Sequence, residues 1–446
     1  MKDLTQGPIG GHVLALSIPM AAGMLLQTIY FFVDLYFVAQ LGDAAIAGVS
    51  AAGNLMFIVF ALTQMLSVGT VALVSHAVGR KDQAEANHVF NQSVSLAALC
   101  AVITLAGGYW LAEPYMRVFA ASEAIVGVGV TFLYWFVPGL ALQYALAVMG
   151  SGLRGTGIVK PTMVVQALTV ILNALLAPVL IAGWITGKPM GVAGAGFATT
   201  ISIAVGVVVL TIYFVRLEHY VRFDPREWAP KLATWGRMLN IGLPSGGEFA
   251  FMAIFIGVMY WVMRDFGDAA QAGFGVGMRI NQMIFVPAMA VAFATAPIAG
   301  QNFGAKKAAR VHQTFRVSAI YSIVIMVALT VLVQFEAEPL ARLFTQEIAV
   351  VAVCVEYLRY ISWNFIGAGL SWTCSSMFQG MGNTWPSFAT SAMRIGIFAI
   401  PAVWMSRQPW FELRHVFMLS VATVLVQAVA NYLWVQREFA KRLSWT

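Results

Sequence analysis

Long apolar segments alternate with short polar connections along almost the whole chain. Crossing a hydrocarbon core of about 30 Å takes roughly 20 helical residues, and each apolar segment is close to this length or longer. The pattern therefore predicts an all-α polytopic membrane protein with twelve transmembrane helices. We expect them at residues 13–38, 46–75, 91–112, 124–148, 161–183, 192–215, 238–263, 271–299, 316–335, 350–372, 387–405 and 415–435.

The second half of the chain repeats the first at a constant offset of 225 residues. Because six spans per half is an even number, both copies enter the membrane from the same side, and the repeats are parallel and pseudo-symmetric. Duplicated bundles of this kind are typical of transporters. The matched pairs include Pro19 with Pro244, Gly42 with Gly267, Lys81 with Lys306, Gly157 with Gly382 and Pro161 with Pro386.

The repeat also predicts the domain organisation. We expect an N-terminal lobe of six spans at residues 1–215, a charged cytoplasmic linker at 216–237 and a C-terminal lobe of six spans at 238–446. The two lobes should be two six-helix bundles around a site between them.

Composition and charge support a membrane protein and indicate its orientation. Hydrophobic residues make up 60 % of the chain and charged residues 10 %, with a mean hydropathy of +0.79, which is more apolar surface than one water-soluble core could bury. Most of the 26 Lys and Arg residues fall in the connections on one side. The positive-inside rule then places both termini in the cytoplasm, with the protein in the inner or plasma membrane.

Other partners and chemistries find little support in the residues. The net charge of +7 reflects topology, and no clustered basic and aromatic surface predicts nucleic-acid binding. Cys100, Cys354 and Cys374 lack metal-ligand spacing, so we expect neither a metal site nor a disulfide. No catalytic motif for a lipid-phosphate transferase occurs, and we expect no enzyme activity and no cofactor.

Asp34 is the most informative charge, because it lies inside the first span with no Lys or Arg within a helical turn. An ionisable side chain at membrane depth is costly and is a functional candidate by default. A carboxyl group in an apolar cavity can load and release a proton, which is the chemistry of ion coupling. Tyr30 shares its helix face and Gln27 extends the polar stripe. The alternative is a structural Asp that caps a broken helix.

Further polar side chains within the predicted spans are candidates for a substrate cavity. Glu248 follows Pro244 by four residues; it could bind a cationic substrate, lie hydrated near the cytoplasmic mouth, or pair with an Arg. The two acids are not equivalent in the repeat, since Asp34 matches Met259 and Glu248 matches Gly23. The other candidates are Asn54, Gln143, Gln166, Asn173 and Thr199 in the first half and Arg279, Asn281, Gln282 and Arg394 in the second.

Taken together, these motifs resemble the multidrug and toxic compound extrusion (MATE) family. The resemblance covers nearly the whole chain, and it implies two six-helix lobes in a V shape around a central cavity, with export of organic cations or other toxic compounds against inward H⁺ or Na⁺. Among the motifs that carry it are Ser17-Ile18-Pro19, Asp34 with Leu41-Gly42-Asp43, residues 153–157 before Lys160-Pro161, Asn173 ahead of Pro178, residues 191–199 and residues 291–304.

Within the family the chain is most similar to the DinF-like branch, which implies coupling through the N-terminal lobe. Asp34 matches the acid of the first span, Tyr30 its neighbour one turn earlier, Asn173 the fifth-span amide and Thr199 the sixth-span hydroxyl. One departure is Ala177, which stands where many relatives carry a second carboxylate. A hard cation such as Na⁺ needs several oxygen ligands, whereas a proton needs one, so we expect H⁺ coupling.

We therefore predict a secondary active multidrug antiporter that exports small organic compounds in exchange for H⁺, surrounded by membrane lipids and working as a monomer. A Na⁺-coupled antiporter is one alternative. A flippase for a lipid-linked precursor is another, although only Arg279 and Arg394 could face a pyrophosphate. The sequence does not specify the substrate, because polyspecific pockets consist of aromatic and Met side chains whose orientation it leaves open.

Overall fold

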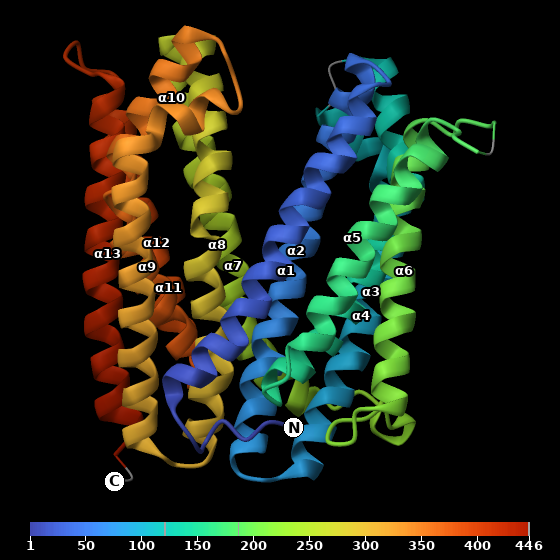
Figure 1. The fold of residues 1–446 in the computed structure, drawn as a ribbon, viewed down its shortest axis with the longest axis vertical. Helices are drawn as coiled ribbons and strands as arrows, with labels where there is room; N and C mark the ends of the chain where they lie inside the picture. The colour runs from blue at the N-terminus through green and yellow to red at the C-terminus, as the bar shows by residue number, and fades with distance from the viewer. Residues whose placement is uncertain (120–121, 186, 445–446) are drawn as a thin grey trace. The chain divides into compact units, whose positions relative to one another are not determined.

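The structure, a computed structural model, describes residues 1–119, 122–185 and 187–444, with the backbone alone for 29–35 and 119. Every regular element in this part of the chain is helical, which confirms the predicted fold class. The elements are α1 (Ile9–Ala39), α2 (Asp43–Gly79), α3 (Gln83–Phe119), α4 (Glu123–Gly155), α5 (Lys160–Ile181), α6 (Val192–Arg216), η1 (Pro225–Glu227), α7 (Leu232–Met263), η2 (Arg264–Phe266), α8 (Asp268–Gly304), α9 (Ala308–Arg342), α10 (Ile348–Ile361), α11 (Asn364–Gly380), α12 (Trp385–Met405) and α13 (Leu413–Arg442) (Figure 1).

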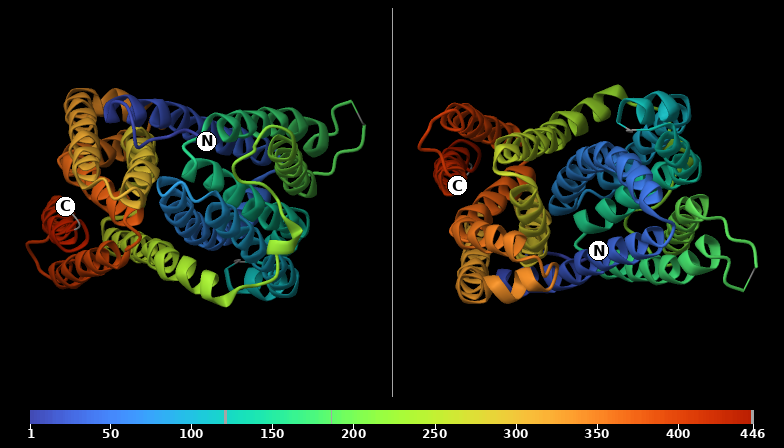
Figure 2. Two further views of the ribbon diagram at one scale, coloured as in Figure 1. Left: turned by 90° about the horizontal axis from the view of Figure 1, so that it is seen from below. Right: turned by 90° about the horizontal axis from the view of Figure 1, so that it is seen from above.

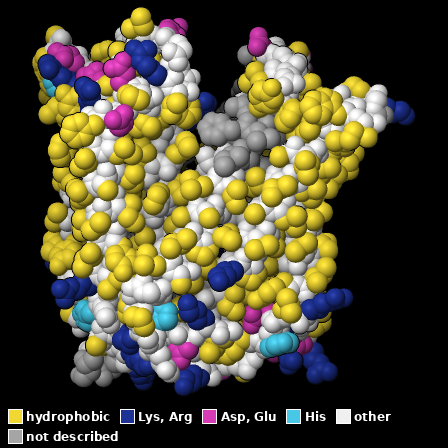
Figure 3. Space-filling view, viewed as in Figure 1, with side chains coloured by type: hydrophobic (Ala, Val, Ile, Leu, Met, Phe, Trp, Pro, Cys, Tyr) yellow, Lys and Arg dark blue, Asp and Glu magenta, His cyan; other side chains and the backbone are white. Residues whose placement is uncertain are grey.

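The helices have the length and composition of membrane spans. In the described residues eleven are long and apolar enough to cross a bilayer, and the bent pair α10 and α11 makes a twelfth. Figure 3 shows hydrophobic side chains over the middle of one face, with most Lys, Arg, Asp and Glu gathered toward the helix ends. The chain is a multi-pass membrane protein, because such a surface is stable only against lipid.

The tenth predicted span is broken into two helices. Between α10 and α11 the helix axis bends by 56°, and a break frees backbone carbonyls that lipid cannot satisfy. Side chains of α9 satisfy them: Thr330 Oγ1 donates to the Ser362 carbonyl oxygen at 3.0 Å, and Gln334 Nε2 donates to the Arg359 carbonyl oxygen at 2.8 Å. The bend is therefore a stabilised part of the fold.

The repeat in the sequence is a repeat in three dimensions. Helices α2 and α8 begin and end at positions 225 residues apart, and α4 has the same start as α10 and the same end as α11 at that offset. The turns match as well. Gly42 and Gly267 have φ of 100° and 88°, Gly157 and Gly382 have φ of 79° and 75°, and Lys81 has φ of 60°. Positive φ favours glycine, which explains why these glycines occur in both copies.

Contacts group the residues into two compact units, with one hydrophobic cluster in the first and two in the second. Unit 1 comprises residues 1–3 and 22–246, and unit 2 comprises residues 4–21 and 247–446. This grouping differs from the predicted lobes in the two leading helices. Helix α1 divides between Ala21 and Ala22, and α7 divides between Gly246 and Gly247, which is the equivalent place in the repeat, just after the repeated proline.

Within each unit the helices pack in the same pattern (Figure 2). In unit 1, α2, α3 and α4 contact one another, α4 contacts α6, and α6 contacts α5. Unit 2 has the equivalent contacts: α8, α9 and α11 contact one another, α11 contacts α13, and α13 contacts α12. The duplication thus preserved the packing of the bundle as well as the ends of its helices.

The first part of α7 packs backbone to backbone against α2 in unit 1. A Cβ at Gly69 would lie 2.5 Å from the Met238 carbonyl oxygen, and one at Gly242 would overlap the Met65 carbonyl oxygen. Glycine at such positions lets two helices approach closely, as small residues do at many membrane helix interfaces.

We expect Gly242→Ala to destabilise the protein by about 1–3 kcal/mol or more, because the obstructing atom is backbone and cannot turn aside. The same substitution at Gly236, also on α7, meets no heavy atom within 4 Å and should be neutral or slightly stabilising. Thermal unfolding of the purified variants, followed by size-exclusion chromatography, compares the two. Equal melting temperatures would contradict the close approach.

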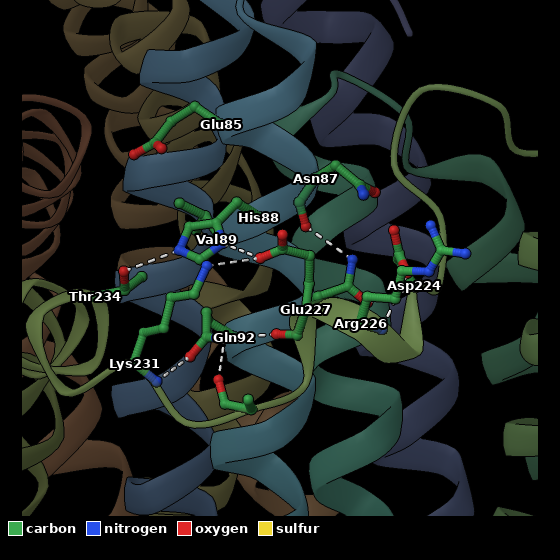
Figure 4. A network of polar contacts seen from close by, with 12 residues as sticks. Glu85, Asn87, His88, Val89, Gln92, Asp224, Arg226, Glu227, Lys231 and Thr234 are labelled. Carbon is green, nitrogen blue, oxygen red and sulfur yellow. Dashed lines mark hydrogen bonds and ion pairs between the residues drawn. The ribbon is translucent and has the colours of Figure 1, made fainter.

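The linker between the predicted lobes is held to α3 by a polar network (Figure 4). His88 Nδ1 lies 2.5 Å from Glu227 Oε2, and Lys231 Nζ lies 3.1 Å from the same oxygen. Gln92 Nε2 donates to the Glu227 carbonyl oxygen at 2.6 Å, and its Oε1 accepts from the Lys231 amide at 2.8 Å. The hydrogen bond from His88, followed by that from Lys231, lowers the pKa of Glu227.

A lowered pKa in the folded state means that Glu227 stabilises the fold above its ordinary pKa and loses this effect as the pH falls through its folded-state pKa. We therefore expect the melting temperature of the wild type to exceed that of Glu227→Gln at neutral pH, and the difference to shrink on acidification. The control is Glu356→Gln, since Glu356 forms no ion pair within the described residues. A difference that does not vary with pH would contradict the role of the Glu227 charge.

Candidate functional site

In unit 1 the structure joins two of the predicted polar residues. Gln166 on α5 donates from Nε2 to Gln27 Oε1 on α1 at 3.1 Å. Gln166 is half-buried and Gln27 is exposed, and the helices approach closely here, since a Cβ at Gly23 would lie 2.5 Å from Gln166 Oε1. The polar stripe predicted on α1 is therefore in contact with α5.

Asn173, two turns after Gln166 on α5, is fully buried. Neither its Oδ1 nor its Nδ2 has a hydrogen-bond partner among the described residues. An enclosed amide without partners costs roughly 1–3 kcal/mol, so a site that retains one indicates a requirement other than stability. Ala177, one turn further along, is also fully buried.

For the remaining predicted residues of the first half, the structure gives less information about a possible role. Thr199 is buried on α6 and donates to the Ala195 carbonyl oxygen at 3.2 Å. Asn54 is exposed on α2, and Gln143 is half-buried on α4. The side chains of Asp34 and Tyr30, the centre of the predicted coupling site, lie outside the described residues.

In unit 2, Glu248 lies on α7 just after the division of that helix. Its Oε1 is enclosed and has no hydrogen-bond partner among the described residues, while the carboxyl group forms a hydrogen bond with Ser387 on α12. The sequence left open whether an Arg pairs with this acid. No ion pair of Glu248 is found in the described part of the chain.

Arg394 on α12 has a different partner. Its Cζ lies 5.0 Å from the centre of the Phe255 ring, a cation–π contact, and its Nε is enclosed without a hydrogen-bond partner among the described residues. The predicted residues of α8 separate onto different faces. Arg279 and Gln282 are exposed, whereas Asn281 is buried with its Oδ1 unpaired in the described structure.

Some of the polar environment was not anticipated from the sequence. Ser375 and Ser387 were not singled out, because serines are common in membrane helices and usually bond to their own backbone. Phe255 was one of many aromatic residues without a distinguishing pattern. Among the described residues no group of three or more His, Cys, Asp and Glu side chains is arranged to hold a metal ion.

Comparison with known proteins identifies the class of molecule. The sequence model of the MatE family matches twice, at residues 19–179 and 244–405, so each match begins at one of the repeated prolines. Two duplicated bundles of membrane helices define a transporter. The chain belongs to the MatE family and is a transporter, which confirms that it is not an enzyme.

Curated relatives and solved structures agree with this assignment. The probable multidrug resistance protein YpnP of Bacillus subtilis is 24 % identical over 92 % of this chain and 89 % of its own. The FAD transporter of Shewanella oneidensis is 26 % identical over 78 % and 77 %. A solved structure described as the outward-facing conformation of a multidrug resistance MATE family transporter superposes with a TM-score of 0.92 at 25 % identity, covering 99 % of this chain and 98 % of that one.

Because Asn173 is buried without a hydrogen-bond partner among the residues whose side chains the structure describes, we expect Asn173→Leu to raise the melting temperature, by removing a desolvation cost of about 1–3 kcal/mol. Asn302 is the matched control. Its Nδ2 donates to the carbonyl oxygens of Leu4 and Ile298, and its Oδ1 accepts from Arg310. Asn302→Leu should therefore lower the melting temperature. A destabilised Asn173→Leu would show that this amide has a partner in the folded protein.

Proposed function

We propose that this chain is a secondary active multidrug efflux antiporter that exports organic, often cationic, compounds in exchange for inward H⁺. The observation that carries the proposal is the double match to the MatE family, together with relatives named as multidrug resistance proteins over about nine tenths of the chain. We further propose that it works as a monomer in the inner or plasma membrane, with both termini in the cytoplasm, and requires no cofactor.

Helix register in unit 1 supports coupling through Asp34. Gln27 and Gln166 are hydrogen-bonded, and α1 and α5, as first and fifth spans, run in the same direction. Asp34 follows Gln27 by seven residues and Asn173 follows Gln166 by seven residues, which is about two helical turns or roughly 10 Å along each axis. This spacing supports a site in which Asp34 and Asn173 lie at the same level along the two helices.

This arrangement favours a proton over a sodium ion. Na⁺ needs several oxygen ligands, and the position one turn after Asn173 holds Ala177, whose side chain offers none. A carboxyl group in apolar surroundings binds a proton without further ligands. Protonation of Asp34 from the outside would remove its charge and let α1 repack against α5, which would narrow a substrate pocket in the N-terminal lobe and expel the substrate. The opposite step follows when the proton leaves to the cytoplasm.

An anionic substrate is the second candidate, motivated by the relative named as a FAD transporter and by the possibility of a lipid-linked precursor. Phosphate groups are bound by several Arg or Lys donors. Arg394 is engaged with Phe255, which leaves Arg279 as the exposed cation of the predicted set. One exposed guanidinium supports cationic substrates better than a pyrophosphate.

Transport by purified protein in proteoliposomes tests the proposal. Efflux of ethidium should be driven by a pH gradient alone, should not be driven by a Na⁺ gradient alone, and should fall at least tenfold in Asp34→Asn, because the amide cannot bind a proton. Asp43→Asn, at the start of α2 outside the apolar core of the span, should transport like the wild type.

Two results would contradict the coupling mechanism. If a Na⁺ gradient drives efflux, the coupling ion is wrong; if Asp34→Asn retains full activity, the coupling residue is wrong. Export of FAD in preference to ethidium under the same pH gradient would favour the anionic substrate.

A further inference from the structure

Two adjoining cavities lie in unit 1 where α6 ends and the linker begins, at the lower end of the molecule in Figure 1. The first has a volume of about 400 Å³ and the second of about 310 Å³. Glu218 and His219 line both cavities, Tyr213 and Tyr220 line the first, and Arg222 lines the second. The proposed coupling uses none of these residues, so the cavities need an explanation of their own.

The turn that carries these side chains is held in place by α3. Gln83 Nε2 donates to the His219 carbonyl oxygen at 3.1 Å. Asn87 Oδ1 accepts from the Arg222 amide at 2.8 Å, and Asn91 Nδ2 donates to the Arg222 carbonyl oxygen at 2.9 Å. Gln83, Asn87 and Asn91 recur every four residues and so share one face of α3. The cavities therefore have a fixed backbone on one side, as preformed binding sites usually do.

Glu218 has no cation beside it among the described residues. The residue is 5 % exposed, and its Oε1 accepts from the Tyr220 amide at 2.9 Å. No ion pair of Glu218 is found in the described part of the chain. A buried carboxylate is costly unless a positive charge compensates it. Tyr213 and Tyr220 line the same cavity, and tyrosine rings attract ammonium groups, so the first cavity favours a ligand with an ammonium group.

The second cavity adds a positive side chain beside an aromatic wall. Arg222 is exposed and has no ion pair among the described side chains. Phe214 and Phe223 line the same cavity, with their ring centres 5.4 Å apart. A guanidinium group binds phosphate oxygens well. The carboxylate of Glu218 and the guanidinium of Arg222 therefore match a ligand that carries both an ammonium group and a phosphate.

The outer face of α6 connects these cavities with the lipid. Val208, Ile212 and Val215 are exposed and lie on one face of the helix, since they are four and three residues apart. In a membrane protein an exposed apolar face of this kind contacts acyl chains. Val215 also lines the second cavity, and Leu217, which is exposed as well, lines the first. A lipid whose chain follows α6 would thus have its headgroup at the cavities.

We propose that the two cavities bind the headgroup of phosphatidylethanolamine, with its ammonium group at Glu218 and its phosphate at Arg222 and His219. Phosphatidylglycerol fits less well, because it has no ammonium group to compensate the carboxylate. The site is separate from Asp34, and its test does not depend on efflux. In the proposed orientation the linker is cytoplasmic, so the lipid belongs to the cytoplasmic leaflet.

Native mass spectrometry of the full-length protein, with equimolar phosphatidylethanolamine and phosphatidylglycerol of matched acyl chains, tests the site. The ratio of the two lipids in protein that carries one lipid should fall roughly fivefold in Glu218→Gln, because the neutral side chain no longer attracts an ammonium group. The oxygen of the new side chain can still accept from the Tyr220 amide, so the turn should keep its conformation.

The matched control is Glu85→Gln. Glu85 Oε1 pairs with Arg237 Nη2 at 3.0 Å near the start of α3 and lines neither cavity, so the lipid ratio of this variant should equal that of the wild type. A ratio that Glu218→Gln leaves unchanged would overturn the proposal, and so would an equal fall in both variants.

If Glu218→Gln is not recovered folded, Arg222→Gln decides. Only the backbone of Arg222 bonds to α3, so this variant should fold and should bind phosphatidylethanolamine roughly fivefold more weakly. Unchanged binding would refute the headgroup site. Glycerophosphoethanolamine, which has the same headgroup without acyl chains, should not displace the lipid at equal concentration. Displacement would show that the site binds a soluble phosphoethanolamine and would overturn the assignment to a lipid.

Discussion

A chain surrounded by hydrocarbon must satisfy its backbone hydrogen bonds internally, and this constraint determines most of the structure. It explains why the regular elements described are helices. It also explains where irregularity is tolerated. The bend between α10 and α11 is compensated by Thr330 and Gln334, which donate to the freed carbonyl groups. Polar side chains of one helix thus make a break in another possible.

The fold could be predicted closely from the sequence because both of its signals are long-range and redundant. Apolar segments of membrane-crossing length specify the spans. The 225-residue offset then predicts each span a second time, from the equivalent span in the other half. The bend after Ile361 was not predicted, since its cause lies in the α9 side chains and not in the local sequence. Pro138 occupies the equivalent position in α4, which continues as one helix, so proline content alone would have pointed to the wrong copy.

The types of residue in the candidate site could be predicted from the sequence, but their arrangement in space could be predicted only in part. Composition singled out Asp34 and Glu248 because carboxyl groups are rare within spans, and that argument requires no coordinates. Whether the side chains of two helices meet depends on how each helix is rotated about its own axis. A single polar residue in the sequence says little about that rotation. Gln27 and Gln166 do meet, whereas Asn281 points away from the face shared by Arg279 and Gln282. The serines next to Glu248 carried no signal, since hydroxyl groups are frequent in such helices.

Because the two halves align at a constant offset, each position in one copy can be compared directly with the equivalent position in the other. Positions at which both copies hold the same residue, such as the glycines with positive φ, mark what any bundle of this shape needs in order to fold. At other positions the copies differ in charge, such as Asp34 against Met259 and Glu248 against Gly23, so that one copy carries an acid that the other lacks. After duplication, one half could therefore change its chemistry while the other half preserved the ancestral architecture. A single bundle could not have done both.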